Sequence, residues 1–300
     1  MRNDIQLLEL LLKDQSLSLP NENTYISWAT DDYCVTDEMD DNSPFAFNAQ
    51  ITPELISSHP DLIQPRIKKQ PSMQTSRSKS RAEVFTPAWI CNAQNNLIDE
   101  QWFGRKDVFN TEYINEEGEH RWLTSKPPIV FPAKRSWMSY VRARRMEITC
   151  GEGPYLISRY DATTGRLIPI SERIGMLDRK FRIINENTPS EPTKANKRQW
   201  IRKAYQALQS IYGFDSQGDN VFLTRESLFL SFCEYYTERW HRHPHRDAVL
   251  KAAEIISWNI WQMDGLNFNA PNSDHYAIIM EWHNTEPLSG KKMTYKDIMK

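Results

Sequence analysis

The hydrophobic and polar positions follow two periods along the chain, and the last third carries the clearest pattern. Apolar residues spaced three to four positions apart predict a helix whose buried face holds Trp200, Ile201, Ala204, Tyr205 and Leu208. Short apolar runs at 210–214, 259–262 and 276–280 predict strands, and helices with N-caps at Asp219 and Asp247 are expected between the first two. Strands that alternate with helices imply a parallel sheet of the α/β class.

Shorter elements are expected in the first two thirds. Asp4 is a suitable N-cap for a helix over 4–13, and Thr52 followed by Pro53 predicts the start of another short helix. The Thr86-Pro87 pair predicts a further helix in the same way, with apolar positions at Trp89, Ile90, Ala93 and Leu97. A short strand is expected at 146–150, and a hairpin around Thr163-Thr164-Gly165 is expected within 157–190.

Composition excludes several classes of protein. With 39% hydrophobic and 25% charged residues, the chain has no window that approaches the roughly 18 apolar residues of a membrane helix. The chain of 300 residues contains 10 glycines and no P-loop, and Leu156 follows Gly151-Glu152-Gly153 where a dinucleotide fingerprint needs its third glycine. The 4 scattered cysteines form no C-x-x-C pair, and the N-terminus lacks a basic and apolar leader. These features favour a reducing cytoplasm.

The formal net charge of -2 conceals charges that are segregated into blocks. Residues 30–41 contain acids and no base, whereas 66–81 contain bases and no acid, among serines and prolines that are typical of a mobile linker. A third basic block lies at 134–145. Because a phosphate backbone attracts such segments, we expect nucleic-acid contacts from Arg66, Lys68, Lys69, Arg77, Lys79 and Arg81. The alternative interpretation is a solvated linker and an ordinary helix face.

Three turns after the predicted strands carry candidate ligand-binding residues, since open parallel sheets bind ligands at the carboxyl ends of their strands. The small-residue turn that begins at Cys150 allows a ligand to approach the backbone. Asp215 has two oxygens for two ribose hydroxyls, and Asp264 is suited to accept from an exocyclic amine. Plain chain reversal for the glycine turn and helix capping for each aspartate are the alternatives.

Four segments in this order resemble motifs of a known family. Residues 81–90 read R-A-E-V-F-T-P-A-W-I, 147–156 read E-I-T-C-G-E-G-P-Y-L, 211–215 read I-Y-G-F-D and 262–266 read Q-M-D-G-L. They resemble the gamma-class adenine-N6 DNA methyltransferases, the modification subunits of type I and type IIG restriction systems. The resemblance implies a Rossmann-like sheet that binds S-adenosylmethionine through Phe85, Thr86, Pro87, Glu147, Cys150, Gly151, Gly153, Asp215 and Asp264.

The departures from the family pattern concern catalysis above all. The family's [NDS]-P-P-[YF] segment, which binds the amino group of the flipped base and stacks on its ring, has no counterpart in this chain. After 276–280 the sequence reads Glu281-Trp282-His283-Asn284, so we expect Glu281 or Asn284 to accept an amine hydrogen and Trp282 to stack. A hairpin that returns through Gly290 is the alternative.

Two other groups of residues have simpler interpretations. His241, His243 and His245 lie in a loop interrupted by arginine and proline, and a solvated basic loop is favoured over a zinc site, so no metal site is expected. Trp28 and its neighbouring tyrosines are expected to pack in the core of an N-terminal element rather than to form a partner-binding face.

The sequence therefore predicts an N-terminal, mostly helical extension over 1–65, a basic linker over 66–81, and a methyltransferase-like α/β domain over 82–300 with an insertion at 157–200. The function implied by the resemblance is that of an S-adenosylmethionine-binding, DNA adenine-N6 methyltransferase-like protein of a restriction-modification or phage-defence system. DNA and a partner subunit of such a complex are the expected partners. The alternative is a catalytically inactive subunit that binds DNA or cofactor and scaffolds a partner.

Overall fold

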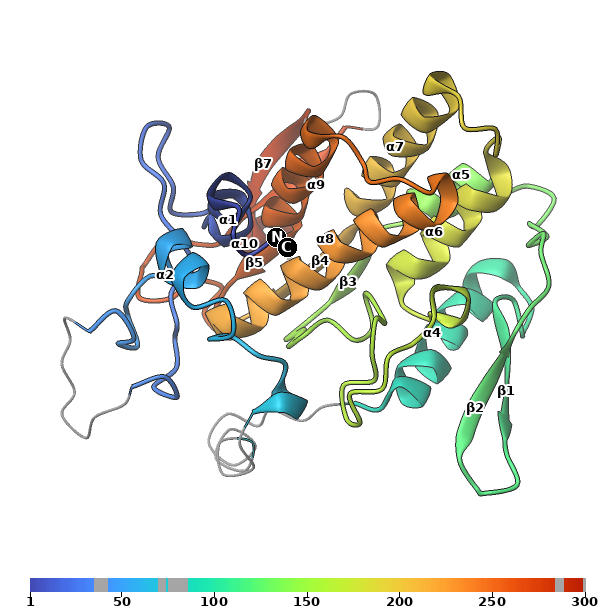
Figure 1. The fold of residues 1–300 in the computed structure, drawn as a ribbon, viewed down its shortest axis with the longest axis horizontal. Helices are drawn as coiled ribbons and strands as arrows, with labels where there is room; N and C mark the ends of the chain where they lie inside the picture. Colours follow the sequence, from blue (N-terminus) through green and yellow to red (C-terminus); the bar gives the residue numbers. More distant parts are fainter. Residues whose placement is uncertain (35–42, 70–73, 75–85, 284–288, 299–300) are drawn as a thin grey trace.

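Three short parallel strands lie at the centre of the molecule. The computed structural model describes residues 1–34, 43–69, 74, 86–283 and 289–298. Strands β3 (Arg145–Glu147), β4 (Ile211–Asp215) and β5 (Ile260–Gln262) pair in the order β3-β4-β5 (Figure 1). The strands predicted at 146–150, 210–214 and 259–262 are therefore confirmed, and the chain is a mixed α and β protein with small sheets.

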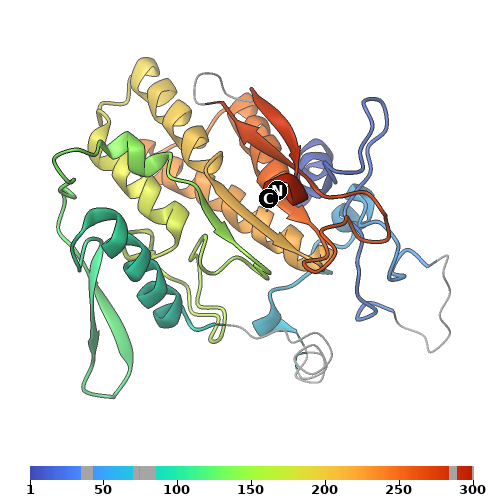
Figure 2. The ribbon, with the colours of Figure 1, turned by 180° about the vertical axis from the view of Figure 1, so that it is seen from behind.

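Long helices cover one face of this sheet. The β3–β4 crossover contains α6 (Met176–Asn187) and α7 (Lys194–Leu208), and the β4–β5 crossover contains α8 (Gly218–Trp240) and α9 (Arg246–Asn259). Parallel strands need such crossovers, and helices usually supply them. Figure 2 shows the sheet from the opposite side, with α8 and α9 behind it. The predicted insertion at 157–200 is thus largely the crossover itself, and its expected hairpin is reduced to the bridge between Tyr160 and Leu167 before the 3-10 helix η2 (Ile170–Glu172).

The strand predicted at 276–280 does not join the parallel sheet. Strand β6 (Ile278–Trp282) pairs antiparallel with β7 (Gly290–Thr294), and α10 (Tyr295–Ile298) follows. The expectation of a further parallel strand was wrong, and the hairpin alternative is confirmed. This hairpin packs beside the sheet face that the helices leave open, where the Tyr212 hydroxyl donates to the Met280 carbonyl at 3.1 Å.

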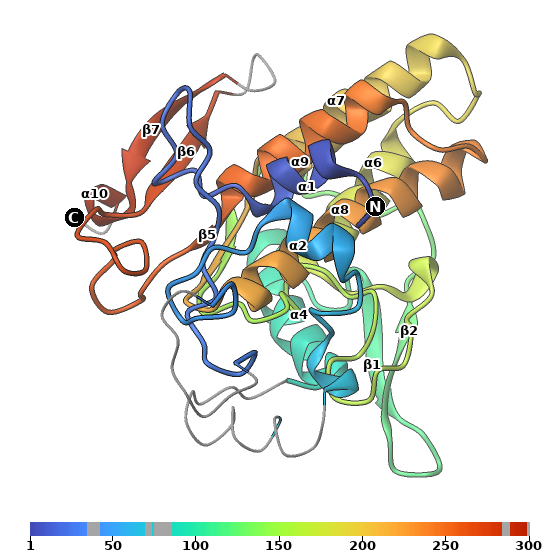
Figure 3. The ribbon, with the colours of Figure 1, turned by 60° about the vertical axis from the view of Figure 1, so that its left-hand side comes forward.

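The N-terminal segment packs into the same core as the rest of the chain. Helices α1 (Ile5–Leu12) and α2 (Pro53–Ser58) have the predicted N-caps, Asp4 and Thr52, which accept from the Leu7 and Leu55 amides. Leu8, Leu11 and Leu12 are fully buried, and α1 packs on α9 and α8 (Figure 3). The described part of 1–65 contains only these two short helices, so the extension is less helical than expected. The 3-10 helix η1 (Arg66–Lys68) follows.

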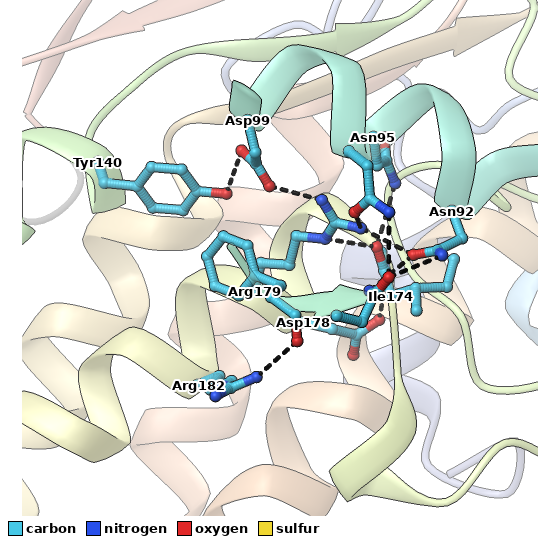
Figure 4. A network of polar contacts seen from close by, with 12 residues as sticks. Asn92, Asn95, Asp99, Tyr140, Ile174, Asp178, Arg179 and Arg182 are labelled. Atoms are coloured by element: carbon cyan, nitrogen blue, oxygen red, sulfur yellow. Dashed lines mark hydrogen bonds and ion pairs between the residues drawn. The ribbon is translucent and has the colours of Figure 1, made fainter. Parts of the chain in front are cut away.

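Helix α4 (Ala88–Phe103) buries a polar face, contrary to expectation. The predicted apolar position Leu97 is 59% exposed, whereas Asn92, Asn95 and Asp99 are buried. The reason is Arg179 of α6, which is 2% exposed and lies beneath α4. Its guanidinium donates to Asn92 and Asp99 (Figure 4). A buried guanidinium requires hydrogen-bonding partners, so the polar stripe faces inward.

The remaining elements lie beside α4. Strands β1 (Asn110–Ile114) and β2 (His120–Thr124) form a hairpin that projects from the body, and α5 (Trp137–Val141) precedes β3 (Figure 1). All four cysteines are free thiols. Over the residues that the structure describes, no helix has the combined length and apolarity that a membrane span requires.

Candidate cofactor site

The loop after β3 is a tight turn built on two glycines with positive φ. Gly151 has φ 53° and Gly153 has φ 72°. The Cys150 amide donates to the Phe214 carbonyl at 2.8 Å, which places the loop against β4. A Cβ on Gly153 would lie 2.9 Å from the Thr224 methyl group on α8, whereas a Cβ on Gly151 would meet no atom within 4 Å. The loop is thus packed on α8 at Gly153 and open at Gly151.

Asp215 joins this loop to the end of β4. Its Oδ2 accepts from the Gly151 amide at 2.9 Å, and its Oδ1 accepts from the Gln217 amide at 3.0 Å. The side chain is almost fully buried, and burial raises the pKa of the carboxyl although both amide hydrogen bonds oppose that effect. The sequence placed Asp215 at a strand end correctly. The structure adds that Oδ1 also accepts from the Asn220 amide nitrogen at 3.4 Å, whereas the Gly151 amide is the one described donor to Oδ2. A carboxylate offers about four acceptor positions, so Oδ2 retains capacity for a hydroxyl.

Glu147 and Cys150 lie at the start of the same loop, with Cys150 buried and Glu147 half-buried. The Glu147 carboxylate accepts from the Leu156 amide at 3.1 Å, and burial raises the pKa of this carboxyl well above its usual range. Burial, with the nearby carboxylates of Asp215 and Glu147, also raises the pKa of the Cys150 thiol. A thiol in this environment stays protonated and is a poor nucleophile. Cys150 therefore serves packing rather than covalent chemistry.

The segment that precedes α4 lies against the same loop. Burial raises the pKa of the Tyr155 hydroxyl, and a hydrogen bond with Thr86 counters part of that shift. The Asn95 amide nitrogen donates to the Tyr155 carbonyl at 3.1 Å, which ties α4 to the loop. Thr86 does not cap α4 as predicted, because the Ala88 amide donates instead to Asp161 at 2.8 Å, with Pro87 at the N-cap position. Phe85 lies outside the described residues.

The Asp264 side chain accepts hydrogen bonds from the turn that follows β5. Its Oδ1 accepts from the Leu266 amide at 2.7 Å and the Asn267 amide at 3.2 Å. The hydrogen bond from Leu266 is the main reason that the pKa of this carboxyl is lowered. The Asp264 carboxylate is therefore ionised and partly exposed, and its described hydrogen bonds are local to the turn.

The candidate catalytic residues on β6 are occupied by other contacts. The Trp282 ring is 7% exposed, and its Nε1 donates to Asn259 Oδ1 at 2.7 Å. Glu281 lies on the opposite face of the strand and accepts from Arg144 at 2.8 Å on the surface. The structure does not bring these two side chains to one place, as expected for adjacent strand residues. Asn284 lies outside the described residues.

One lysine of the basic block, Lys69, is buried rather than on the surface. The Lys69 ammonium lies 2.8 Å from the Asp219 carboxylate, and both side chains are buried. The Arg66 backbone amide donates to Glu152 at 2.6 Å, and Lys68 is exposed. Lys69 is thus placed as an internal ion-pair partner and not as a surface cation. Arg77, Lys79 and Arg81 lie outside the described residues.

Asp219 and Tyr33 make a contact beside the candidate site that the sequence interpretation missed. Asp219 was expected to cap α8, but the N-cap is Gln217, and Asp219 in the first turn accepts from the Tyr33 hydroxyl at 2.9 Å. The spacing of these residues contains no signal for this contact.

His245, and not Asp247, is the N-cap of α9 through the Ala248 amide. Among the described residues, no group of three or more potential metal ligands is placed to hold an ion.

Comparison with models of known protein families, with curated proteins and with solved structures finds no match to this chain.

Proposed function

We propose that this chain binds S-adenosylmethionine at the carboxyl ends of β3, β4 and β5, as an adenine-N6 DNA methyltransferase-like protein of a restriction-modification or phage-defence system. The observation that carries the proposal is the hydrogen bond from the Gly151 amide to Asp215, which joins two of the resembling segments at one sheet edge. The Thr86 contact with Tyr155 brings a third segment to the same loop.

The residues present fit a nucleoside cofactor. The space beside Gly151, where a Cβ would meet no atom within 4 Å, allows a ligand to touch backbone. Asp215 would hold a ribose hydroxyl through the remaining acceptor capacity of Oδ2, and Asp264, which follows β5, would accept from the adenine amine. Thr86 and Pro87 would border the methionine end. When bound, the cofactor supplies the methyl group.

A second candidate function is favoured by the β6–β7 hairpin. Trp282 is buried against Asn259, and Glu281 is paired with Arg144, so neither side chain is free to receive a flipped base in this arrangement. Base methylation needs an acceptor and an aromatic platform at the transferred methyl group. The second candidate is therefore a cofactor-binding subunit that does not transfer methyl groups alone and scaffolds a partner.

Calorimetry with S-adenosylmethionine tests the cofactor site. Gly151→Asn places a side chain in the open space while keeping a residue that tolerates positive φ, so we expect binding to be lost. Asp215→Ala should weaken binding ten- to a hundred-fold, because charge-assisted hydrogen bonds contribute about 1.5–3 kcal/mol. Thermal unfolding establishes that each variant remains folded.

Gly118→Asn is the matched control for the glycine change. Gly118 has φ 79°, and a Cβ there would likewise meet no atom within 4 Å, but it lies in the turn between β1 and β2. This variant should bind the cofactor as the wild type does. Absence of binding by the wild type, or unchanged binding by folded Gly151→Asn and Asp215→Ala, would refute the proposed site.

A further inference from the structure

Helix α7 lies at the end of the molecule remote from the start of α8 and the candidate cofactor site (Figure 3). Its sequence, KANKRQWIRKAYQAL, gives it a basic surface. Helix α8 begins beside Asp215 and ends at Trp240, next to Lys197 of α7. Its 23 residues, about 34 Å at 1.5 Å per residue, therefore lie between Asp215 and the first turn of α7. Helix α7 contains no acidic residue, and α9 packs alongside it. The α7 basic surface consists of Lys194, Lys197, Arg198, Arg202, Lys203 and Lys251.

Two grooves flank α7. The larger has a volume of about 820 Å³ and is bordered by Lys194 and Lys197 on one side and Lys251 of α9 on the other. The smaller, of about 440 Å³, lies along Lys203. Arg198 and Arg202 line both grooves, so these two side chains form a ridge between them. Asp247 is the acidic residue in the lining of the larger groove.

Aromatic rings lie beside three of the four lysines of this surface. The Nζ atoms lie 5.9 Å from the Trp240 ring for Lys197, 5.8 Å from Trp137 for Lys203 and 5.8 Å from Tyr205 for Lys251. None of the ion pairs between described residues involves a member of the α7 basic surface. Partial burial and the neighbouring Arg142 and Arg202 charges lower the pKa of Lys203. The surface therefore concentrates positive charge, and its neighbouring carboxylates are Asp247 in the larger groove and Glu254 near Lys251.

The surroundings of this surface favour a nucleic-acid backbone as its partner. Across the described residues, the large hydrophobic side chains that are exposed lie outside α7, α8 and α9. A protein interface is typically built on an apolar core, and a helix that lies in a membrane surface needs an apolar face. Binding of a phosphate backbone requires cations along a groove and no apolar contact. Ile201, Tyr205 and Tyr236 line the larger groove but are themselves buried, so the groove presents mainly cations to a partner. This pattern fits phosphates better than a protein or a lipid surface.

We propose that the α7 basic surface binds the phosphate backbone of duplex DNA. The proposal rests on the proposed function for the choice of DNA, and it goes beyond that function by placing a contact at the far end of α8, outside 66–81. At this distance the surface anchors the duplex and does not contact the base that would be modified. Its test needs no cofactor, so its outcome is independent of S-adenosylmethionine binding.

Fluorescence anisotropy with a labelled duplex of arbitrary sequence, without cofactor, tests this proposal between about 50 and 200 mM salt. Each phosphate contact contributes about -0.9 to the slope of log affinity against log salt. The triple variant Lys194→Gln, Arg198→Gln, Arg202→Gln should therefore bind more weakly, with a slope shallower by about 2.7. The charge-conserving variant Arg198→Lys, Arg202→Lys should retain the wild-type slope.

A charge-matched control separates this surface from general electrostatics. Lys106→Gln, Lys126→Gln, Arg166→Gln removes the same charge from exposed positions away from α7, and it should leave the slope unchanged. An undetectable complex at low salt, or equal slopes for the two triple variants, would overturn the proposal. Equally strong binding to polyglutamate or to anionic phospholipid vesicles would also overturn it, in favour of an acidic protein or a membrane surface.

Discussion

The Lys69 ammonium and the Asp219 carboxylate form a buried ion pair, 2.8 Å apart, that ties the segment after η1 to the first turn of α8. Asp219 also accepts from the Tyr33 hydroxyl, so two N-terminal segments meet at this carboxylate. Asp219 lies four residues after Asp215 in the sequence. The pair thereby fixes the N-terminal segments beside the candidate cofactor site.

We predict that Lys69→Met lowers the free energy of unfolding by about 3–5 kcal/mol, because it leaves Asp219 buried without its cation. Urea unfolding at neutral pH measures the loss. Adding Asp219→Leu to Lys69→Met should cost less than the sum of the single changes, since contacting partners are not additive. Additive single changes would show that the two charges do not interact.

The buried face of α4 yields a prediction opposite to that of the hydrophobic pattern. Asp99→Ala removes the carboxylate that accepts from both Arg179 and Tyr140, and it should destabilise the protein by about 3–5 kcal/mol. Leu97→Ala, two residues away and 59% exposed, should change stability by about 0.5 kcal/mol or less. Thermal or urea unfolding of both variants decides between the two faces, and a larger loss at Leu97 would contradict the structure.

Gly153 and Gly151 should respond differently to alanine. Gly153→Ala combines positive φ with a 2.9 Å approach to the Thr224 methyl group, so we expect a loss of about 2–4 kcal/mol. Gly151→Ala carries only the backbone strain, about 1–2 kcal/mol. Thr224→Ser keeps the hydroxyl that donates to the Gly151 carbonyl and removes the methyl group, so it should recover part of the Gly153→Ala loss. Unfolding free energies that show no recovery would argue against this packing contact.

Glu147 makes stability depend on pH. Its pKa in the folded protein is raised well above the usual value of 4.5, so the folded state retains a proton that the unfolded state releases. This contribution to stability is full below about pH 4.5 and is lost as the pH rises toward the folded pKa, at about 1.4 kcal/mol for each pH unit in that interval. Glu147→Gln, which keeps an acceptor for the Leu156 amide, should flatten the curve of unfolding free energy against pH. A curve of unchanged slope would contradict this assignment.

We expect substitution of Trp282 to lower the stability of the protein, because its side chain is buried and hydrogen-bonded. Trp282→Phe leaves Asn259 Oδ1 without its donor, and we expect a loss of about 1–3 kcal/mol. Glu281→Gln disrupts a surface pair with Arg144 and should cost less than about 1 kcal/mol. Incubation with tritiated S-adenosylmethionine and DNA should show no methyl transfer by the isolated chain. Efficient transfer that Trp282→Phe and Glu281→Gln leave unchanged would place the acceptor elsewhere.

The sequence by itself determined the elements whose signals are local. Asp4 and Thr52 cap their helices through amides three residues away, and the apolar runs at 211–215 and 260–262 are buried strands with helices between them. The glycine turn and Asp215 were placed at strand ends for the same reason. The hydrogen bonds of the two caps lie within one helix each. The strand ends follow from the order of strands and helices along the chain.

Tertiary structure alone decided the rest, because the partners come from distant parts of the chain. Asp161 rather than Thr86 caps α4, and Arg179 turns the polar side of that helix inward. A strand's apolar pattern does not specify its neighbour, so β6 paired with β7 instead of extending the parallel sheet. Lys69 lies in a basic run of sequence, but a buried carboxylate 150 positions away lowers its free energy inside the protein.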